Sequence, residues 1–267
     1  MLSLLMNLDL TGKTALVCGS TQGIGRASAI ELALLGANII LMARNENTLQ
    51  TTLADLDTSR GQHHQYAVAD FSQPGSVSKA LAILLTKTPV IQILINNTGG
   101  PAGGSLIEAQ ADAFVQTFHN HLLNNQTLVQ ALTPGMREAG YGRIVNIIST
   151  SVKQPIMGLG VSNTIRGAVA QWAKTLSLEL GRWGITVNNV LPGYTQTARL
   201  EAVVAMRANA SGQRQDEVAA QLESEIPIGR FAAAEEVAAA VAFLCTPAAA
   251  SISGINMPVD GGKTGGL

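Results

Sequence analysis

Short, strongly apolar runs alternate with longer segments of helical periodicity along nearly the whole chain. The runs are rich in Val, Ile and Leu, and they lie at 14–18, 38–42, 66–69, 91–95, 143–148 and 186–191, with a final short strand expected at 256–259. Strands that are apolar on both faces are typical of a parallel sheet covered by helices on both sides. The alternation therefore predicts an α/β fold with a doubly wound, mostly parallel sheet of about seven strands.

The segments between these runs have the apolar spacing of helices. Helical periodicity covers about 23–35, 46–58, 75–86, 109–139, 157–181, 198–222 and 234–245. No linker, repeat or shift in composition divides residues 1–267, so we expect a single domain. The polar, strand-free piece at 198–224 is predicted to be a helical insertion that serves as a substrate lid.

Composition excludes several classes of partner. Seventeen basic residues against eighteen acidic ones give a net charge of −1, which does not favour binding to nucleic acid. Cys18 and Cys245 lie in separate apolar runs, so we expect no disulfide and a reducing, cytoplasmic location. The histidines, at positions 63, 64, 119 and 121, do not have the spacing of a metal site.

The apolar start of the chain is not expected to direct it to a membrane. Residues 1–10 lack the basic segment of a secretory signal, and no later stretch has about 20 uncharged apolar residues. We therefore expect no membrane partner.

A glycine-rich turn stands where the first strand passes into the first helix. It reads Gly19-Ser20-Thr21-Gln22-Gly23-Ile24-Gly25. Glycines at this point let the backbone approach a pyrophosphate, which the free N–H groups of the helix start can bind. A glycine pattern alone indicates only a tight turn, but strand, turn and helix together predict nucleotide binding.

The end of the second strand discriminates between the two nicotinamide dinucleotides. An acidic residue there would bind the ribose hydroxyls of NAD(H), whereas this chain has Arg44 and no acid before Glu46. A guanidinium can bind a 2′-phosphate through two hydrogen bonds, so NADP(H) is the predicted cofactor. The alternative is that Arg44 is a solvated surface charge.

Together with further motifs, this turn resembles the short-chain dehydrogenase/reductase family, most closely its bacterial 3-oxoacyl-[acyl-carrier-protein] reductase branch. The motifs that carry the resemblance are Asp70-Phe71, Asn96-Asn97-Thr98-Gly99, Pro192-Gly193-Tyr194-Thr195-Gln196-Thr197 and the segment 253–262. The resemblance extends from Leu10 to Gly262 and implies a Rossmann-type fold.

The resemblance also implies roles for individual residues. Asp70 and Phe71 would contact the adenine, and Thr195 and Thr197 would hold the nicotinamide carboxamide. The full set expected to bind the cofactor is Gly19, Thr21, Gln22, Gly23, Ile24, Gly25, Arg44, Asp70, Phe71, Asn97, Gly99, Arg166, Pro192, Gly193, Thr195 and Thr197. A homotetramer is expected, because the helices at 109–139 and 157–181 would pair across a two-fold axis.

The catalytic positions depart from the family pattern. Ser149 matches the family serine, but Ser162 stands where the family has Tyr and Arg166 where it has Lys. His121 stands at the position of the assisting Asn, next to Asn120. The candidate catalytic residues are therefore Ser149, Ser162, Arg166 and His121.

This substitution keeps a positive charge but removes the usual proton donor. A serine hydroxyl is a much weaker acid than a tyrosine phenol, while Arg166 can still hold the nicotinamide ribose. Tyr194, His121 and Lys153 remain as alternative donors, and Thr150 and Ser151 compete with Ser149 as the effective hydroxyl. Ser162 does not follow a strand and lacks the last glycine of a nucleophile elbow, which argues against a hydrolase.

Two functional hypotheses follow. The first is an NADP(H)-dependent oxidoreductase that reduces a 3-oxoacyl-like or other ketone, or oxidises the corresponding alcohol, as its small-molecule substrate. The second is a catalytically impaired NADP(H)-binding pseudoenzyme, which would act as a redox sensor or as the partner subunit of an active homologue. Lyase or isomerase chemistry on the same scaffold is a third, smaller possibility.

Overall fold

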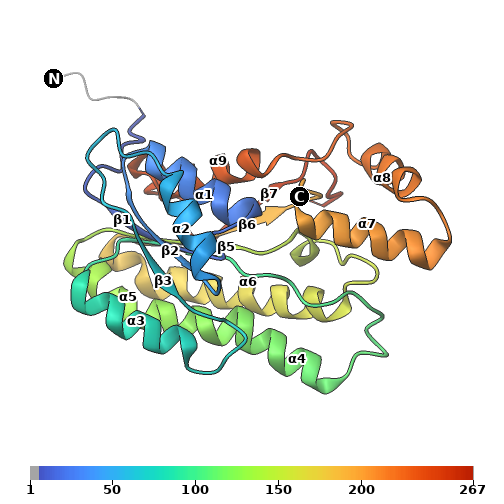
Figure 1. Ribbon diagram of the computed structural model, residues 1–267, viewed down its shortest axis with the longest axis horizontal. Coiled ribbons are helices and arrows are strands. Elements are labelled where there is room, and N and C mark those ends of the chain that lie inside the picture. Colours follow the sequence, from blue (N-terminus) through green and yellow to red (C-terminus); the bar gives the residue numbers. More distant parts are fainter. Residues whose placement is uncertain (1–5, 267) are drawn as a thin grey trace.

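The computed structural model describes residues 6–266, which form a three-layer α/β arrangement (Figure 1). The strands of the middle layer are β1 (Thr14–Cys18), β2 (Asn38–Ala43), β3 (Gln65–Val68), β4 (Ile93–Asn96), β5 (Gly142–Ile147), β6 (Ile185–Pro192) and β7 (Asn256–Val259). Within the described residues these seven strands lie in the order β3-β2-β1-β4-β5-β6-β7, and all neighbours are parallel. The predicted α/β fold with a seven-strand parallel sheet is confirmed. The strand order reverses at β1 and β4, which is where sheets of this kind bind ligands.

Helices cover both faces of the sheet. They are α1 (Gly23–Leu34), α2 (Glu46–Ala54), α3 (Ser76–Lys87), α4 (Ala111–Phe118), α5 (Asn124–Glu138), α6 (Gly160–Leu180), α7 (Ala198–Ser211), α8 (Gln215–Ser224) and α9 (Ala234–Cys245). One face is covered by α1, α2 and α9, and the other by α3, α5 and α6 (Figure 1). None of the helices in the described part of the chain is both long enough and apolar enough to cross a membrane.

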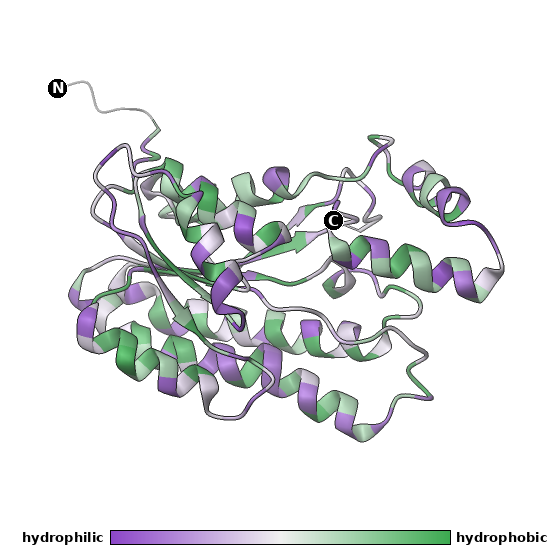
Figure 2. Ribbon diagram, in the orientation of Figure 1, coloured by the Kyte–Doolittle hydropathy of each residue, from purple (hydrophilic) through white to green (hydrophobic). Residues whose placement is uncertain are grey.

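The core consists of two apolar layers separated by the sheet. Along β1, Ala15 and Val17 pack in one layer, whereas Leu16 and Cys18 pack in the other. All four side chains are fully buried, and Figure 2 shows strands that are largely apolar between helices in which apolar and hydrophilic residues alternate. Alternate residues of a strand point to opposite faces, so both sets must be apolar when both faces are covered. This is why each strand reads as a continuous apolar run.

A row of asparagines crosses four strands of the sheet, and three of them, Asn96, Asn146 and Asn189, are buried. Asn96 donates to Asn146, Asn146 donates to Asn189 and Asn189 donates to Asn256, each through a side-chain amide hydrogen bond of 2.8 Å. The same residues are direct partners in the strand register. Slipping one strand by a single residue would turn its asparagine to the other face and leave buried amides without partners. The asparagine row, as we name these four residues, therefore fixes the register of β4 to β7.

We expect Asn146→Ala to lower the free energy of unfolding by about 2–4 kcal/mol, because it removes the partners of Asn96 and Asn189 and each unsatisfied buried polar group costs about 1–3 kcal/mol. Urea denaturation followed by circular dichroism measures this change. The exposed Asn47→Ala on α2 is the matched control and should change the free energy by less than about 0.5 kcal/mol. Equal effects of the two substitutions would contradict the assigned role.

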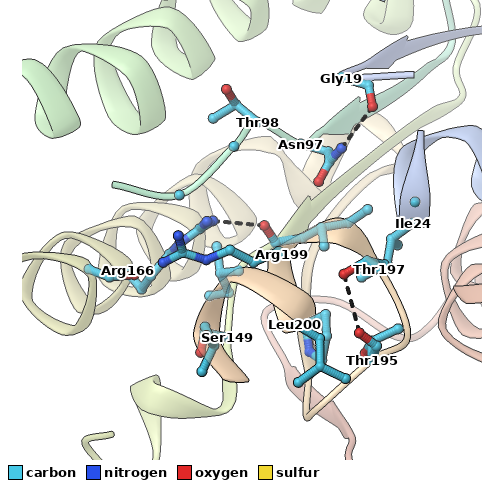
Figure 3. A pocket seen from close by; sticks show the side chains of 18 of the residues that line it. Gly19, Ile24, Asn97, Thr98, Ser149, Arg166, Thr195, Thr197, Arg199 and Leu200 are labelled. Carbon is cyan, nitrogen blue, oxygen red and sulfur yellow. Dashed lines mark hydrogen bonds between the residues drawn. The ribbon is translucent and has the colours of Figure 1, made fainter. Parts of the chain in front are cut away.

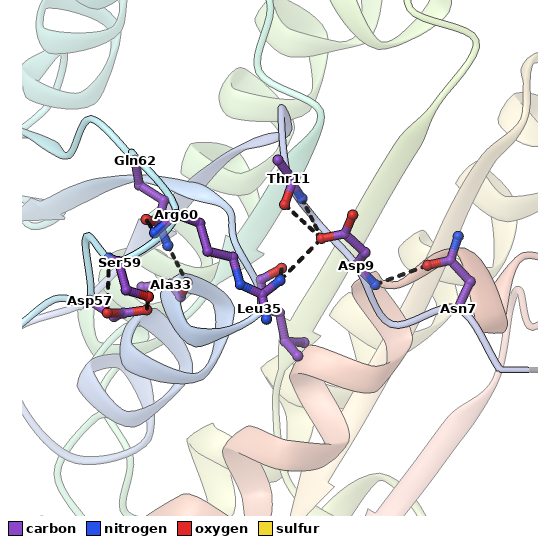
Figure 4. Close-up of polar contacts among 9 residues, drawn as sticks. All are labelled: Asn7, Asp9, Thr11, Ala33, Leu35, Asp57, Ser59, Arg60 and Gln62. Atoms are coloured by element: carbon purple, nitrogen blue, oxygen red, sulfur yellow. Dashed lines mark hydrogen bonds and ion pairs between the residues drawn. The ribbon is translucent and has the colours of Figure 1, made fainter. Parts of the chain in front are cut away.

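A polar cluster joins the start of the described chain to the end of α1 (Figure 4). The Asp9 carboxylate accepts hydrogen bonds from the backbone N–H and the hydroxyl of Thr11. It also forms an ion pair with Arg60, at 3.2 Å. The hydrogen bonds from Thr11 hold the pKa of Asp9 below its ordinary value. Arg60 also donates to the Leu35 carbonyl, and Gln62 donates to a carbonyl in the last turn of α1. The end of α1 is thus capped by side chains from the loop before β3.

Residues 1–5 of the apolar first segment lie outside the described residues.

Two long helices predicted from periodicity are each divided. The predicted helix 109–139 consists of α4, a π-helical turn at His119–Leu123 and α5. A π-helical turn shifts the hydrogen bonding by one residue without disturbing apolar periodicity over a long segment, so the sequence does not reveal it. The predicted piece 198–224 is helical but contains two helices. α7 ends at Ser211, because the next residue, Gly212, has the left-handed conformation (φ 71°).

Candidate functional site

A cavity of about 910 Å³ opens at the carboxyl ends of the strands. Fifteen of the sixteen predicted cofactor residues line it, and the exception is Gly25, which is buried. Those that line it are Gly19, Thr21, Gln22, Gly23, Ile24, Arg44, Asp70, Phe71, Asn97, Gly99, Arg166, Pro192, Gly193, Thr195 and Thr197. Parallel strands end at the same edge of a sheet, so segments far apart in the sequence meet here.

The glycine turn is packed too tightly for side chains. Gly19 and Gly23 have φ values of 57° and 52°, a region in which residues with a side chain are strained. A Cβ on Gly25 would lie 2.2 Å from the Gly19 carbonyl oxygen and 2.6 Å from the Asn97 amide nitrogen. That amide in turn donates to the carbonyls of Cys18 and Gly19 (Figure 3). The turn is held in a fixed shape beside the N-terminus of α1, where backbone N–H groups can bind a pyrophosphate.

We expect Gly25→Ala to weaken dinucleotide binding by at least about tenfold, because the added methyl group forces the Gly19 carbonyl out of position. Titration of NADPH followed by its fluorescence measures the affinity, and thermal unfolding reports separately on folding. Gly181→Ala is the control, since a Cβ there meets no atom within 4 Å of the described chain. Unchanged NADPH affinity in folded Gly25→Ala would contradict this account of the turn.

Arg44, Asp70 and Phe71, which follow β2 and β3 in the chain, line one end of the cavity. The Asp70 carboxylate accepts hydrogen bonds from the backbone N–H and the hydroxyl of Ser72, at 2.9 and 2.7 Å. These bonds, together with the weaker influence of Arg44, lower the pKa of Asp70. Arg44 is exposed, and within residues 6–266 it makes no ion pair. Its guanidinium is free to bind an anion.

The opposite end of the cavity brings Ser149, Ser162 and Arg166 together. Ser149 follows β5, and its hydroxyl oxygen accepts from the Ser151 backbone at 3.1 Å, which leaves the hydroxyl hydrogen free to donate. Thr150 also lines the cavity, whereas Ser151 does not. Ser162 is buried near the start of α6, one helical turn before Arg166. Two hydroxyls and one guanidinium therefore line the same cavity.

Arg166 is held by the backbone of β5, one residue after Asn146 of the asparagine row. Its guanidinium donates to the Ile147 carbonyl at 2.9 Å, and its side chain is buried. Burial and, secondarily, the positive charge of Arg199 lower the pKa of Arg166 to about 10. The group is still protonated at neutral pH. Figure 3 shows Arg199, which sequence reasoning did not select, directed into the same part of the cavity.

The π-helical turn decides which of two neighbours faces the cavity. Asn120 lines the cavity, whereas His121, the residue at the expected position, is buried and is not among the lining residues of the described chain. Burial and the positive charge of Arg166 hold the pKa of His121 well below its ordinary value, against the effect of a hydrogen bond with the Gly99 backbone. His121 is therefore neutral at pH 7 and supports the loop rather than facing the cavity.

The two other alternative proton donors occupy different surroundings. Tyr194 lines the cavity and packs edge-to-face on Phe231, with ring centroids 6.2 Å apart. The Lys263 ammonium lies 5.3 Å from the centre of the Tyr194 ring. Lys153 is exposed and is not among the residues that line the cavity in the described chain. Tyr194 is thus the better placed of these two.

Comparison with known proteins assigns this site to a family. Residues 19–264 match the family model described as Enoyl-(Acyl carrier protein) reductase. The chain belongs to the short-chain dehydrogenase/reductase family. It is 31% identical over 257 residues to the 3-oxoacyl-[acyl-carrier-protein] reductase FabG of Pseudomonas aeruginosa, covering 96% of this chain and 98% of the relative. The predicted family resemblance is confirmed.

Solved structures of this family share the whole fold. An L-sorbose reductase of Gluconobacter frateurii, complexed with NADPH and L-sorbose, has a TM-score of 0.90 and 28% identity, covering 98% of this chain and all of that one. An NAD⁺-bound xylitol dehydrogenase has a TM-score of 0.87 and 27% identity, covering 94% and 99% of the two chains. The relatives are NAD(P)-dependent oxidoreductases, so the predicted enzyme class is confirmed at the level of the family.

Proposed function

We propose that this protein is an NADP(H)-dependent oxidoreductase that interconverts a ketone and an alcohol at an atypical Ser149/Ser162/Arg166 site. One observation carries the proposal. The two hydroxyls and the guanidinium lie in the same cavity as the glycine turn and the Thr195 and Thr197 segment. A carbonyl compound that reaches these hydroxyls therefore shares the cavity with the dinucleotide.

The residues present fit an NADP(H) molecule along the cavity. The glycine turn and the N-terminus of α1 would hold the pyrophosphate, and Arg44 would hold the 2′-phosphate. Thr197 donates to the Thr195 carbonyl at 3.2 Å, which shapes the segment that would meet the nicotinamide. Family members of this fold hold NADPH or NAD⁺, so the choice of NADP(H) rests on Arg44.

Arg44→Ala should abolish a several-fold preference for NADPH over NADH, because it removes a charge-assisted contact worth about 1–3 kcal/mol. Fluorescence titration of both reduced cofactors against the unaltered protein and the variant measures the two dissociation constants. NADH binding should hardly change, which makes it the internal control. Equal affinity of the unaltered protein for NADPH and NADH would refute the cofactor assignment.

The site can stabilise a carbonyl oxygen but has no strong acid of its own. When bound, the dinucleotide supplies or accepts the hydride. Ser149 and Ser162 would donate hydrogen bonds to the substrate oxygen, and the protonated Arg166 would stabilise negative charge that develops there. The proton would reach the oxygen through water or through a side chain such as Tyr194, since Arg166 does not readily release its own.

We expect slow reduction of 3-oxoacyl thioesters by the unaltered protein, and an increase in the Ser162→Tyr, Arg166→Lys double variant. General acid catalysis contributes about 10²- to 10⁴-fold, and the double variant should recover a measurable part of that factor. NADPH oxidation with a short 3-oxoacyl thioester measures both rates. High activity of the unaltered protein that survives Ser162→Ala would show that another group carries the proton.

The same substitution supports a second candidate, a dinucleotide-binding pseudoenzyme or regulatory partner subunit. Ser162 and Arg166 replace the groups that usually complete the proton transfer, whereas the glycine turn and the threonine segment are kept. A protein that binds NADPH tightly but turns over no ketone or alcohol, before or after the double substitution, would favour this alternative.

Three broader assignments complete the proposal. We propose that α7 and α8 form a substrate lid, since α7 supplies Arg199, Leu200 and Val203 to the wall of the cavity. A homotetramer is supported by exposed apolar side chains on α4 and α6, among them Val115 and Leu178. A cytoplasmic location is supported by Cys18 and Cys245, which are both buried free thiols.

A further inference from the structure

The end of the cavity around Arg166 carries an excess of positive charge. Arg166, Arg199, Arg207 and Lys263 all line the cavity, and within the described residues Asp70 is the one carboxylate that lines it. Lys263 is paired with Glu225. Within residues 6–266, the three arginines make no ion pair. A concave site with several unpaired guanidinium groups attracts anions.

Arg199 and Arg166 approach each other from different elements. Arg199 is in the first turn of α7 and donates one hydrogen bond to the Pro101 carbonyl, at 2.9 Å. Arg166, on α6, donates one hydrogen bond to the Ile147 carbonyl. They lie close enough for the charge of Arg199 to act on Arg166, and both are directed into the same space in Figure 3. Each guanidinium has five N–H donors, so most of them remain available.

Arg166 is buried and Arg199 is exposed, and a bound anion would offset the repulsion between their like charges. The anionic groups of the cofactor would bind elsewhere in the cavity. The pyrophosphate belongs at the glycine turn, and the 2′-phosphate belongs at Arg44. The pair at Arg166 and Arg199 lies instead at the end with Ser149 and Ser162, where the substrate carbonyl would bind. An anionic group on the substrate would relieve the repulsion between the two guanidiniums.

We propose that the substrate is a small oxo acid with a free carboxylate, which Arg199 binds while Ser149 and Ser162 hold the ketone oxygen. This inference rests on the proposed oxidoreductase function and names its substrate class. A planar guanidinium can bind a carboxylate through two parallel hydrogen bonds, which also orients the ketone. Arg166 adds positive charge beside both groups. A neutral ketone or amide would leave the two cations uncompensated, so the site discriminates against it.

The test compares acids with their neutral amides on the protein–NADPH complex. The probes are acetoacetate and 3-oxohexanoate, each paired with its amide, and both binding and NADPH oxidation are measured. We expect each acid to bind about ten- to a hundredfold more tightly than its amide, the effect of one charge-assisted contact. Arg199→Gln should remove this preference without changing the affinity for NADPH. Arg199→Lys should retain part of it.

Arg182→Gln is the matched control, because Arg182 is an exposed arginine that stacks on Trp183 at the opposite end of β6. It should leave the acid preference unchanged. Acids and amides that bind within about threefold of each other would overturn the inference, and so would an Arg199→Gln variant whose main loss is in NADPH affinity. The latter result would assign Arg199 to the cofactor.

These outcomes are separable from those of the proposed function. Amides reduced as rapidly as acids would leave the oxidoreductase intact and refute the carboxylate contact. Failure of the unaltered protein to bind NADPH would refute the proposed function itself. Tight acid binding without any turnover would support the carboxylate site and favour the pseudoenzyme.

Discussion

The row of hydrogen-bonded asparagines across β4 to β7 is the interaction on which the site depends. Buried amides in an apolar sheet must be paired, so the row permits one register of these four strands. The residues that build the cavity follow directly from it. Asn97 adjoins the first asparagine, and the Ile147 carbonyl that holds Arg166 adjoins the second. The glycine turn after β1 is joined to this frame by Asn97, whose amide donates to the Cys18 and Gly19 carbonyls.

The same framework explains how the buried Arg166 is accommodated. A buried guanidinium is costly unless its donors are satisfied, and the Ile147 carbonyl satisfies one at a fixed position. The remaining donors and the charge are then presented to the cavity. Together with Arg199, Arg166 supplies the positive charge on which the proposed carboxylate site rests. The proposed loss of a proton donor at Ser162 and the proposed anion site at Arg166 belong to two positions one turn apart on α6.

The strands were predictable because both faces of the sheet are covered. Each strand is then a continuous apolar run, and β1 and β7 have the bounds predicted from the sequence. The glycine turn was predictable for a similar reason, since strand, glycines and helix are adjacent in the chain. The division of the helix at 109–139 was not. A π-helical turn changes hydrogen bonding without changing which residue types are present, and it places Asn120 rather than His121 at the cavity.

The α/β class, the order of the elements, the nucleotide turn and the presence of Ser162 and Arg166 after Ser149 could all be read from the sequence. All of these depend on patterns local to the chain or on its resemblance to a family. Only the folded chain reveals that Arg199 and Arg166 line the same cavity and that the asparagines of four strands form one row. Such contacts arise between elements distant in sequence, and they are fixed by how helices and strands pack, which no local periodicity records.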